Sequence, residues 1–273
     1  MEMLKITNLT KTFNAGTVNE KVALSGLSLT LNEGDFVTVI GGNGAGKSTM
    51  LNAICGVWRP DSGKIEVDGV DVTDMPEYKR AKYFGRVFQD PMKGTAPDME
   101  IAENLAIARR RGTKRKLVWG IRRGERDEYK KILAELDLGL ENRLSSKVGL
   151  LSGGQRQAVT LIMATLVAPK LLLLDEHTAA LDPKTAAKVL EITERIVREK
   201  KLTTVMITHN MKDAIRYGNR LIMMHEGNIA VDVSGEEKKN LTVEDLLSLF
   251  NNASGSEFSS DRALLSASAD ITE

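Results

Sequence analysis

Residues 36–49 read FVTVIGGNGAGKST, and this stretch decides the fold class of the chain. Its first five residues, 36–40, are mostly apolar and rich in β-branched side chains, which predicts a buried parallel strand. Glycines follow at once, and from Lys47 to about Cys55 the chain has no proline and good helix formers. Strand, glycine-rich loop and helix are the context that the G-x-x-x-x-G-K-[ST] pattern requires. The stretch therefore predicts a phosphate-binding loop in an α/β fold.

This loop has the chemistry to hold a nucleotide. Glycine allows the backbone to turn so that successive N–H groups point at phosphate oxygens, and the helix N-terminus adds its positive end. Lys47 is expected to reach the β- and γ-phosphates, and the Ser48 hydroxyl to bind Mg²⁺. The alternative, a glycine-rich turn without a ligand, is disfavoured by the flanking strand and helix. The expected nucleotide-binding residues are Gly41, Asn43, Gly44, Ala45, Gly46, Lys47, Ser48 and Thr49.

A second motif, LLLLDE over residues 171–176, predicts a buried strand that ends in two carboxylates. In doubly wound sheets, ligands bind beyond the carboxyl ends of the strands. Asp175 is therefore expected to hold Mg²⁺, directly or through water, and Glu176 to polarise the attacking water. Asp175 could instead be an acidic N-cap of a following helix. The phosphate-binding loop upstream favours the interpretation as a catalytic site.

With these motifs, the chain resembles the nucleotide-binding subunits of ATP-binding cassette (ABC) transporters from about Leu4 to Phe250. The resemblance implies an α/β fold: a P-loop NTPase (RecA-like) core with an antiparallel β subdomain and an inserted α-helical subdomain. It also implies ATP and Mg²⁺ as cofactors and identifies 41–49 as Walker A and 171–176 as Walker B. Five further family motifs are matched by Phe13, which would stack on adenine, Gln89 of the Q-loop, residues 151–155 of the signature, residues 180–182 of the D-loop and the switch His209.

The roles implied by the resemblance each have an alternative. Phe13 offers a flat apolar face to adenine, or it is a core residue of the first strand. Gln89 offers an amide oxygen to Mg²⁺ or water, or it is a satisfied surface amide before Pro91. His209 can donate to a γ-phosphate oxygen, or it caps the next helix. The expected catalytic residues are Glu176, His209 and Gln89, and the expected metal ligands are Ser48, Gln89 and Asp175.

The signature is expected to open a helix whose two glycines make a second anion-binding N-terminus. By resemblance, this surface faces the ATP of an opposite subunit in a head-to-tail dimer, where Ser152 and Gly154 contact the γ-phosphate. Hydrolysis removes those contacts and the dimer opens. An ordinary helix N-cap is the alternative. The nucleotide-binding residues expected from these motifs are Ser152, Gly153, Gly154, Gln155 and the D-loop Asp182.

The string DEHTAALDP, residues 175–183, departs from the usual family pattern at His177, where most members have proline. Without that proline the loop is less rigid. The same string resembles a subset of uptake systems, some of them tryptophan-type importers. This resemblance implies a solute importer with a separate permease and, indirectly, an extracytoplasmic substrate-binding protein. His177 is either a titrating group beside the γ-phosphate or a hydrogen-bonding group that does not titrate, and the second is favoured.

Composition agrees with a cytoplasmic subunit on the inner face of the membrane. The chain has 273 residues, 42% of them hydrophobic, and a net charge of +1, which argues against a general nucleic-acid binder. It lacks an N-terminal signal peptide and any apolar run of the ~20 residues that a membrane span needs. Cys55 is the only cysteine, which makes a disulfide framework or zinc site unlikely. Membrane crossing must come from partner subunits.

The expected ABC ATPase domain covers residues 1–250. Residues 251–273, rich in serine, are expected to be a disordered tail. Within the domain, strands alternate with helices in the core, and the segment at 101–105 resembles the family's region of contact with the membrane domain. The expected parts are a core at 1–88 and 169–232, a helical subdomain at 93–168 and a C-terminal helix at 242–250.

Residues 109–126 carry nine basic residues and one acid. They form either a solvated face, a surface near anionic lipid headgroups or a nucleic-acid contact. Two classes of function therefore remain: a transporter ATPase, or a non-transport ABC ATPase acting on nucleic acid or ribosomes. The second class usually has two cassettes, long coiled-coil insertions or zinc modules, and none appears here. No nucleic-acid partner is expected.

Overall fold

The structure is a computed structural model that describes residues 1–113 and 119–254. The chain forms two compact units. Unit 1 is Met1–Arg80 together with Leu202–Glu273, and unit 2 is Ala81–Lys201. Unit 2 is wider than the segment 93–168 that was expected to be helical, because two strands and a long helix pack with its helices. No helix in the described part of the chain combines the length and the apolar character needed to cross a membrane.

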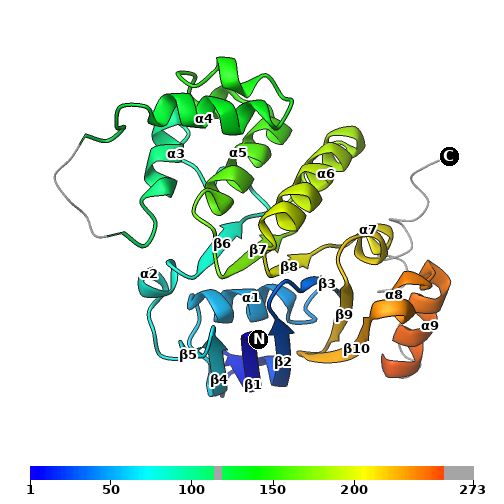
Figure 1. Ribbon diagram of the computed structural model, residues 1–273. Coiled ribbons are helices and arrows are strands. Elements are labelled where there is room, and N and C mark those ends of the chain that lie inside the picture. The colour runs from blue at the N-terminus through cyan, green and yellow to red at the C-terminus, as the bar shows by residue number, and fades with distance from the viewer. Residues whose placement is uncertain (114–118, 255–273) are drawn as a thin grey trace. The chain divides into compact units, whose positions relative to one another are not determined.

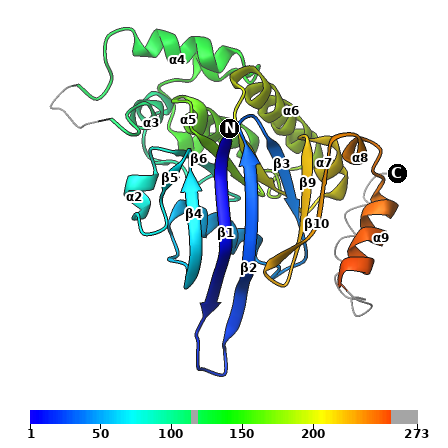
Figure 2. The same ribbon diagram turned by 60° about the horizontal axis from the view of Figure 1, so that its bottom comes forward.

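One sheet of unit 1 is antiparallel, with the strand order β2-β1-β4-β5 (Figure 2). Alternate residues such as Leu4 and Ile6 are buried and lie opposite Leu31 and Leu29 of the neighbouring strand, as expected for a sheet with one face in the core. Polar residues near the ends of the first two strands also pair, as Glu2 does with Asn32. The strands are β1 (Glu2–Phe13), β2 (Lys21–Asn32), β4 (Ser62–Val67) and β5 (Val70–Asp71).

A second group of strands in unit 1 surrounds the fully buried β3 (Phe36–Ile40). Strands β8 and β9 are parallel to it, and β10 is antiparallel to β9. Val39 lies opposite Ile207, so the loops that follow β3 and β8 leave the sheet at the same edge. The other strands are β8 (Thr204–Ile207), β9 (Arg220–His225) and β10 (Asn228–Ser234).

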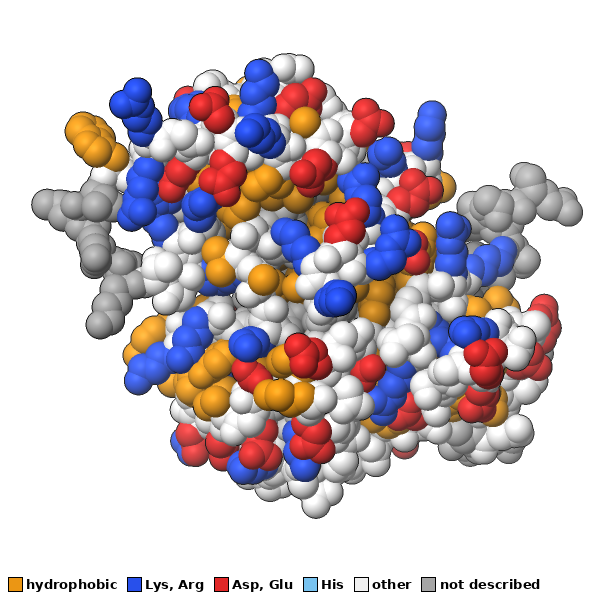
Figure 3. Space-filling view, in the orientation of Figure 1, with side chains coloured by type: hydrophobic (Ala, Val, Ile, Leu, Met, Phe, Trp, Pro, Cys, Tyr) orange, Lys and Arg blue, Asp and Glu red, His pale blue; other side chains and the backbone are white. Residues whose placement is uncertain are grey.

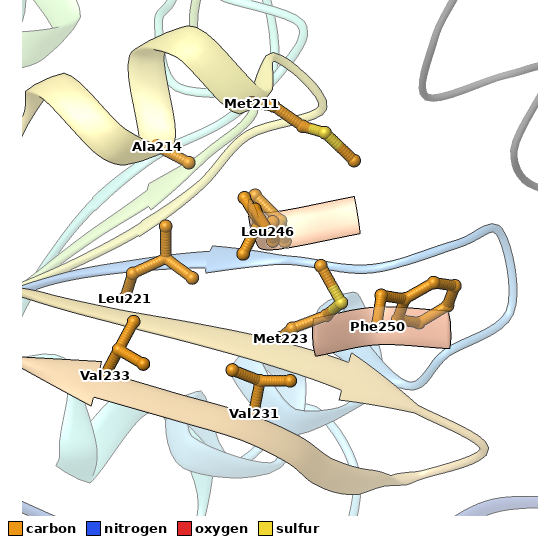
Figure 4. Close-up of a cluster of buried hydrophobic side chains, with 9 residues drawn as sticks. Met211, Ala214, Leu221, Met223, Val231, Val233, Leu246 and Phe250 are labelled. Carbon is orange, nitrogen blue, oxygen red and sulfur yellow. The ribbon is translucent and has the colours of Figure 1, made fainter. Parts of the chain in front are cut away.

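The C-terminal helix α9 closes a hydrophobic cluster on this sheet (Figure 4). Leu246 and Phe250 belong to one cluster with Met211 and Ala214 of α7 and with residues of β9 and β10, and Phe250 lies beside Met223. The helix continues four residues past the expected end at 250, because nothing before Gly255 interrupts it; the rest of the expected tail lies outside the described residues. The helices of unit 1 are α1 (Lys47–Cys55), α2 (Glu77–Arg80), α7 (Met211–Arg216), α8 (Gly235–Lys239) and α9 (Val243–Ser254).

Unit 2 contains two parallel strands and most of the long helices (Figure 1). Residues 171–174 are fully buried, as their run of leucines predicts. Val87 of β6 lies opposite Leu174 of β7, so the segments that follow both strands emerge at one edge. The elements are β6 (Phe84–Val87), α3 (Ile101–Arg109), α4 (Glu125–Ala134), the 3₁₀ turns η1 (Leu140–Asn142) and η2 (Val148–Leu150), α5 (Gly153–Thr165), β7 (Leu171–Asp175) and α6 (Pro183–Lys200).

Candidate nucleotide-binding site

The glycine-rich loop between β3 and α1 is shaped by contacts with the turn between β9 and β10. Gly41 has φ 150°, and a Cβ atom there would lie 2.3 Å from the carbonyl oxygen of Met224, so only glycine fits. The Gly227 N–H of the turn donates to the Ala45 carbonyl at 3.1 Å. Inside the loop, the Ala45 N–H donates to Gly42 at 3.2 Å. The bent conformation of the loop is therefore stabilised by hydrogen bonds and close contacts within the chain.

Lys47 is the buried cation of this loop, with 5% of its surface exposed. Its Nζ donates to the carbonyl oxygens of Gly41 at 2.7 Å and Gly42 at 3.0 Å. Ser48, in the first turn of α1, is exposed, as are Asn43 and Gly44 at the tip of the loop. The loop thus offers a buried ammonium group, a hydroxyl and a helix N-terminus within a few residues of each other, a set that suits phosphate and its metal.

His209 follows β8 and lies at the same edge of the sheet as this loop. The Thr208 N–H donates to the carbonyl of Val39 at 3.1 Å, which fixes the end of β8 beside the end of β3. The side chain that caps α7 is Asn210, whose oxygen accepts from the Asp213 N–H at 3.2 Å. The alternative that His209 caps this helix is therefore wrong.

Phe13 ends β1 and is half-buried, so it is not a core residue. The ring of Trp58 meets it edge-on with centroids 5.2 Å apart. Lys21 lies opposite Phe13 in the β1–β2 pairing, and its Nζ is 3.0 Å from the position of a Cβ on Gly44. The sequence interpretation missed Trp58 and Lys21, since neither belongs to a motif.

In unit 2, the structure brings the ends of β6 and β7 together. Gln89 lies in an exposed turn after β6, and Asp175 and Glu176 follow from β7 at the same edge. Glu176 has φ 48°, a left-handed conformation that is uncommon for a residue other than glycine. The helix after Asp175 begins only at Pro183, so the N-cap alternative for Asp175 is wrong. The left-handed conformation of Glu176 costs about 1–3 kcal/mol, and residues in such conformations cluster at functional sites.

Asp175 also has a partner that the sequence interpretation missed. The Nη2 atom of Arg86 donates to Oδ2 of Asp175 at 3.2 Å. The only available signal was an arginine inside an otherwise apolar strand, FGRV in β6.

His177 is buried, with 2% of its surface exposed. Its Nε2 lies 3.1 Å from the Thr193 hydroxyl. Burial lowers the pKa of His177 from 6.5 to about 4, because the charged imidazolium would lose its hydration. The imidazole is therefore neutral near pH 7, and the interpretation of His177 as a titrating group there is wrong.

The signature residues open α5 as a capping box. The Ser152 hydroxyl accepts from the Gln155 N–H, and the Gln155 Oε1 accepts from the Ser152 N–H, both at 3.3 Å. Ser152 and Gly153 are exposed, so a second molecule can reach them. The Nε2 of Gln155 donates to the Leu138 carbonyl at 3.2 Å. The Gln155 side chain is thus engaged inside the unit.

The signature and the D-loop pack against each other. A Cβ atom on Gly154 would lie 2.0 Å from the Thr185 methyl group, so this contact requires glycine. Asp182 caps α6 by accepting from the Thr185 N–H at 3.1 Å, and the hydrogen bonds from Thr185 lower the pKa of its carboxyl. The exposed ends of both helices therefore form one surface of unit 2.

The expected metal ligands are all hard oxygen donors: a hydroxyl (Ser48), an amide (Gln89) and a carboxylate (Asp175). Such a set suits Mg²⁺, which keeps several waters and takes most other ligands from phosphates. Within 1–113 and 119–254, no group of three His, Cys, Asp or Glu could hold a metal ion by itself. The donor chemistry therefore fits a metal ion that arrives with the nucleotide.

Much of the charge in the basic segment 109–126 is used inside unit 2. Arg111 donates to the carbonyls of Ala164 and Val167 near the end of α5. Arg122 and Arg123 are exposed, and residues 114–118 lie outside the described part. Figure 3 shows acidic and basic side chains interspersed on the visible face. The ion pairs of the segment include Arg109–Glu128 at 2.6 Å, Arg110–Glu125 at 3.3 Å and Arg126–Glu100 at 2.8 Å.

Comparisons with known proteins agree with this arrangement. The family profile described as "ABC transporter" matches residues 24–179. A tyrosine transport ATP-binding protein of Clostridioides difficile (strain R20291) is 47% identical over 251 residues, which cover 92% of this chain and 100% of that protein. The lipoprotein-releasing system ATP-binding protein LolD of Geobacter metallireducens (strain ATCC 53774 / DSM 7210 / GS-15) is 34% identical, with 84% and 99% covered.

Solved structures show the same fold. The dimeric, post-hydrolysis structure of the ATP-binding cassette MJ0796 bound to ADP and Pi is 31% identical, covers 85% of this chain and 98% of that one, and has a TM-score of 0.71. The ADP conformation of the cassette MJ1267 is 29% identical, with 92% and 98% covered and a TM-score of 0.74. The predicted α/β fold of a P-loop ATPase is therefore confirmed.

Proposed function

Since this chain belongs to the ABC transporter family and is an ATP-binding, ATP-hydrolysing transporter subunit, we propose that it powers the uptake of an aromatic amino acid. It would act with a separate permease and, indirectly, with an extracytoplasmic substrate-binding protein. The observation that supports this most is the full-length similarity to a tyrosine transport ATP-binding protein. The string at residues 175–183, which resembles that of tryptophan-type uptake systems, favours the same class of solute.

We assign the nucleotide contacts on this basis. The loop at 41–49 cradles the phosphates, with the ammonium group of Lys47 turning from its two loop carbonyls to the β- and γ-phosphates. Ser48, Gln89 and Asp175 would hold Mg²⁺, and the ion would supply positive charge that offsets the charge of the phosphates. Glu176 orients the attacking water and accepts its proton.

Two further residues of unit 1 are proposed to contact the nucleotide. His209, at the end of β8, donates a hydrogen bond to a γ-phosphate oxygen. Phe13 stacks on adenine with the face of its ring, and its ring also forms a T-shaped pair with that of Trp58.

The dimer is the state in which hydrolysis takes place. The N-terminus of α5, in which Ser152 and Gly153 are exposed and Gly154 is buried, would contact the γ-phosphate of a second copy. Asp182 would lie beside it at the same interface. Support comes from the exposure of Ser152 and from the dimeric structure of the related cassette MJ0796. Gln155 contributes indirectly, because its side chain holds the capping box.

The permease is proposed to contact the Q-loop region of unit 2, which would keep the subunit on the inner face of the membrane. The segment 101–105 was expected here, but Ile101 is fully buried. Met92, three residues after Gln89, is 39% exposed and is a better candidate. An aspartate at Met92 should weaken this contact without disturbing the core.

The alternative function, a non-transport ATPase on nucleic acid or ribosomes, has less support. Much of the basic segment that suggested it forms ion pairs and hydrogen bonds inside unit 2. Neutralising Arg109–Arg111 would therefore disturb the fold as well as any surface. The relatives named above are transport or release proteins by name.

The test is uptake by membrane vesicles that contain the subunit together with its permease and substrate-binding protein. We expect ATP-dependent accumulation of labelled tyrosine or tryptophan, lost in Glu176→Gln. Met92→Asp should release the subunit from the membrane fraction, while Tyr78→Asp, a change at a side chain of unit 1 that is 74% exposed, should not. A complex that hydrolyses ATP but exports these solutes, or ignores them, would contradict the proposal.

A further inference from the structure

Arg86 is the charged residue of strand β6, and it lies beside the carboxylate proposed to hold the metal. Its Nη2 is 3.2 Å from Oδ2 of Asp175, and the two side chains are only 14% and 15% exposed. The pairing of β6 with β7 places Arg86 opposite Leu173, within reach of the end of β7. An ion pair so shielded from water is stronger than one on the surface.

The guanidinium group of Arg86 has a second contact, with the residue that follows strand β6. Its Cζ lies 4.5 Å from the centroid of the Phe88 ring, a cation–π distance. Phe88 is held in turn by Gln157 of the signature helix, whose Nε2 donates to the Phe88 carbonyl at 3.2 Å and whose side chain is buried. Arg86 can therefore leave Asp175 and keep a favourable contact with the ring of Phe88, whose backbone is held by Gln157.

Arg86 therefore contacts Asp175, one expected metal ligand of unit 2, and Phe88, which directly precedes Gln89, the other. A guanidinium group and Mg²⁺ both bind carboxylate oxygens through charge and lone pairs. We infer that Arg86 and Mg²⁺ are alternative partners of Asp175, so that Arg86 sets how strongly ATP binding depends on the metal. This inference rests on the proposed role of Asp175 as a metal ligand.

The competing interpretation is that Arg86 only positions Asp175 for the metal. The two interpretations predict opposite results when the guanidinium is removed. Competition predicts tighter binding of ATP with Mg²⁺, because the metal no longer displaces a cation. Without metal, binding should be unchanged or weaker, because the negative charge of Asp175, no longer offset by the guanidinium, repels the triphosphate. Positioning predicts weaker binding with Mg²⁺.

The experiment measures the Kd of mant-ATP by fluorescence, once in EDTA and once in saturating Mg²⁺. For each variant, the Kd in EDTA is divided by the Kd in Mg²⁺, so a higher ratio means a stronger dependence of binding on the metal. Because both values come from the same protein, a general loss of folded protein cancels. We expect Arg86→Met to raise the ratio by about fivefold or more. Arg86→Lys, which keeps the charge, should stay within about twofold of the wild type. Arg126→Met, which removes an ion pair elsewhere in unit 2, should leave the ratio unchanged.

A double-mutant cycle isolates the pair. In an Asp175→Asn background, Arg86→Met should no longer change the ratio. An unchanged or lower ratio in Arg86→Met would overturn the inference, and Arg86→Gln replaces this variant if it does not fold. If Mg²⁺ has no effect on the wild-type Kd, the proposed metal site itself fails. If Mg²⁺ acts on the wild type but Arg86→Met does not move the ratio, only the inference about Arg86 fails.

Discussion

The imidazole Nε2 of His177 lies 3.1 Å from the hydroxyl of Thr193, and both side chains are buried. The Thr193 hydroxyl donates to the Val189 carbonyl at 2.8 Å, so it accepts from His177, and Nε2 carries the proton. This bond ties the residue after Glu176 to the middle of α6. This side-chain contact restrains the loop at position 177, where the family resemblance leads us to expect a rigid proline.

The first prediction concerns stability against pH. The pKa of His177 falls from 6.5 to about 4 on folding, so below pH 6.5 the unfolded chain takes up a proton that the folded chain refuses. The free energy of unfolding should therefore fall as pH drops through this window, by up to about 3 kcal/mol at pH 4. Urea unfolding at several pH values between 7.5 and 4.5 measures this, and His177→Gln should have a flatter profile than the wild type.

Thr193→Val is the matched control for this experiment. It removes the hydroxyl but leaves the imidazole buried, so stability should fall at every pH while the dependence on pH remains. Identical profiles for the wild type and His177→Gln would show that His177 does not resist protonation in the folded state.

The second prediction tests Glu176. Glu176→Gln should keep ATP affinity and slow hydrolysis by about 10²-fold or more, because the amide cannot accept the proton of water. It should also accumulate an ATP-bound dimer, visible by light scattering. Asp175→Asn is the comparison, since loss of a metal ligand should lower affinity for Mg-ATP as well. Turnover of Glu176→Gln within about threefold of the wild type would remove Glu176 from the role of base.

The sequence predicted those parts of the site that depend on local pattern. The strand and loop at 36–49 and the strand ending at Asp175 follow from apolar runs and glycines. Contacts made by side chains from distant segments were missed. Arg86 and Lys21 come close to Asp175 and Gly44 only when the strands pair. The spacing of these residues along the chain does not predict the contacts. The segment that contains Ile101 was expected to contact a partner, but Ile101 is buried. The sequence pattern of a helix does not show which other segment packs on each of its faces.

The third prediction concerns Arg80, a buried cation of α2 that donates hydrogen bonds to the C-terminal end of α1. Its guanidinium donates to the carbonyls of Ala53 and Ile54 at 2.8 and 2.9 Å and to those of Met75 and Thr73 at 2.6 and 2.8 Å. Arg80→Met removes one donor from each of these carbonyls, of which Ala53 keeps the Gly56 N–H at 3.1 Å, and it should cost about 3 kcal/mol of unfolding free energy. Because α1 carries Lys47 and Ser48, the Kd for mant-ATP should rise too.

Arg59→Met is the control for Arg80. Arg59 pairs with Asp74 at 2.6 Å, but the two side chains are 78% and 72% exposed. Its loss should change the free energy of unfolding by no more than about 0.5 kcal/mol. Equal effects of the two substitutions in urea unfolding would show that the hydrogen bonds of Arg80 do not stabilise the end of α1.

The last prediction tests whether the signature acts on the ATP of another copy. Ser152→Asp keeps an oxygen that can cap α5, but it places a negative charge where the γ-phosphate of the partner would lie. It should abolish turnover while single-chain ATP affinity stays near the wild type; Ser152→Asn, a neutral cap, should stay active. Lys47→Ala should instead weaken binding itself. A mixed dimer of Ser152→Asp and Lys47→Ala contains one composite site with an intact Lys47 and an intact Ser152, so the mixture should recover activity that neither variant has alone. If the mixture stays inactive although mixed dimers form on a size-exclusion column, Ser152 acts within its own chain, and its role is that of the helix cap seen in the structure.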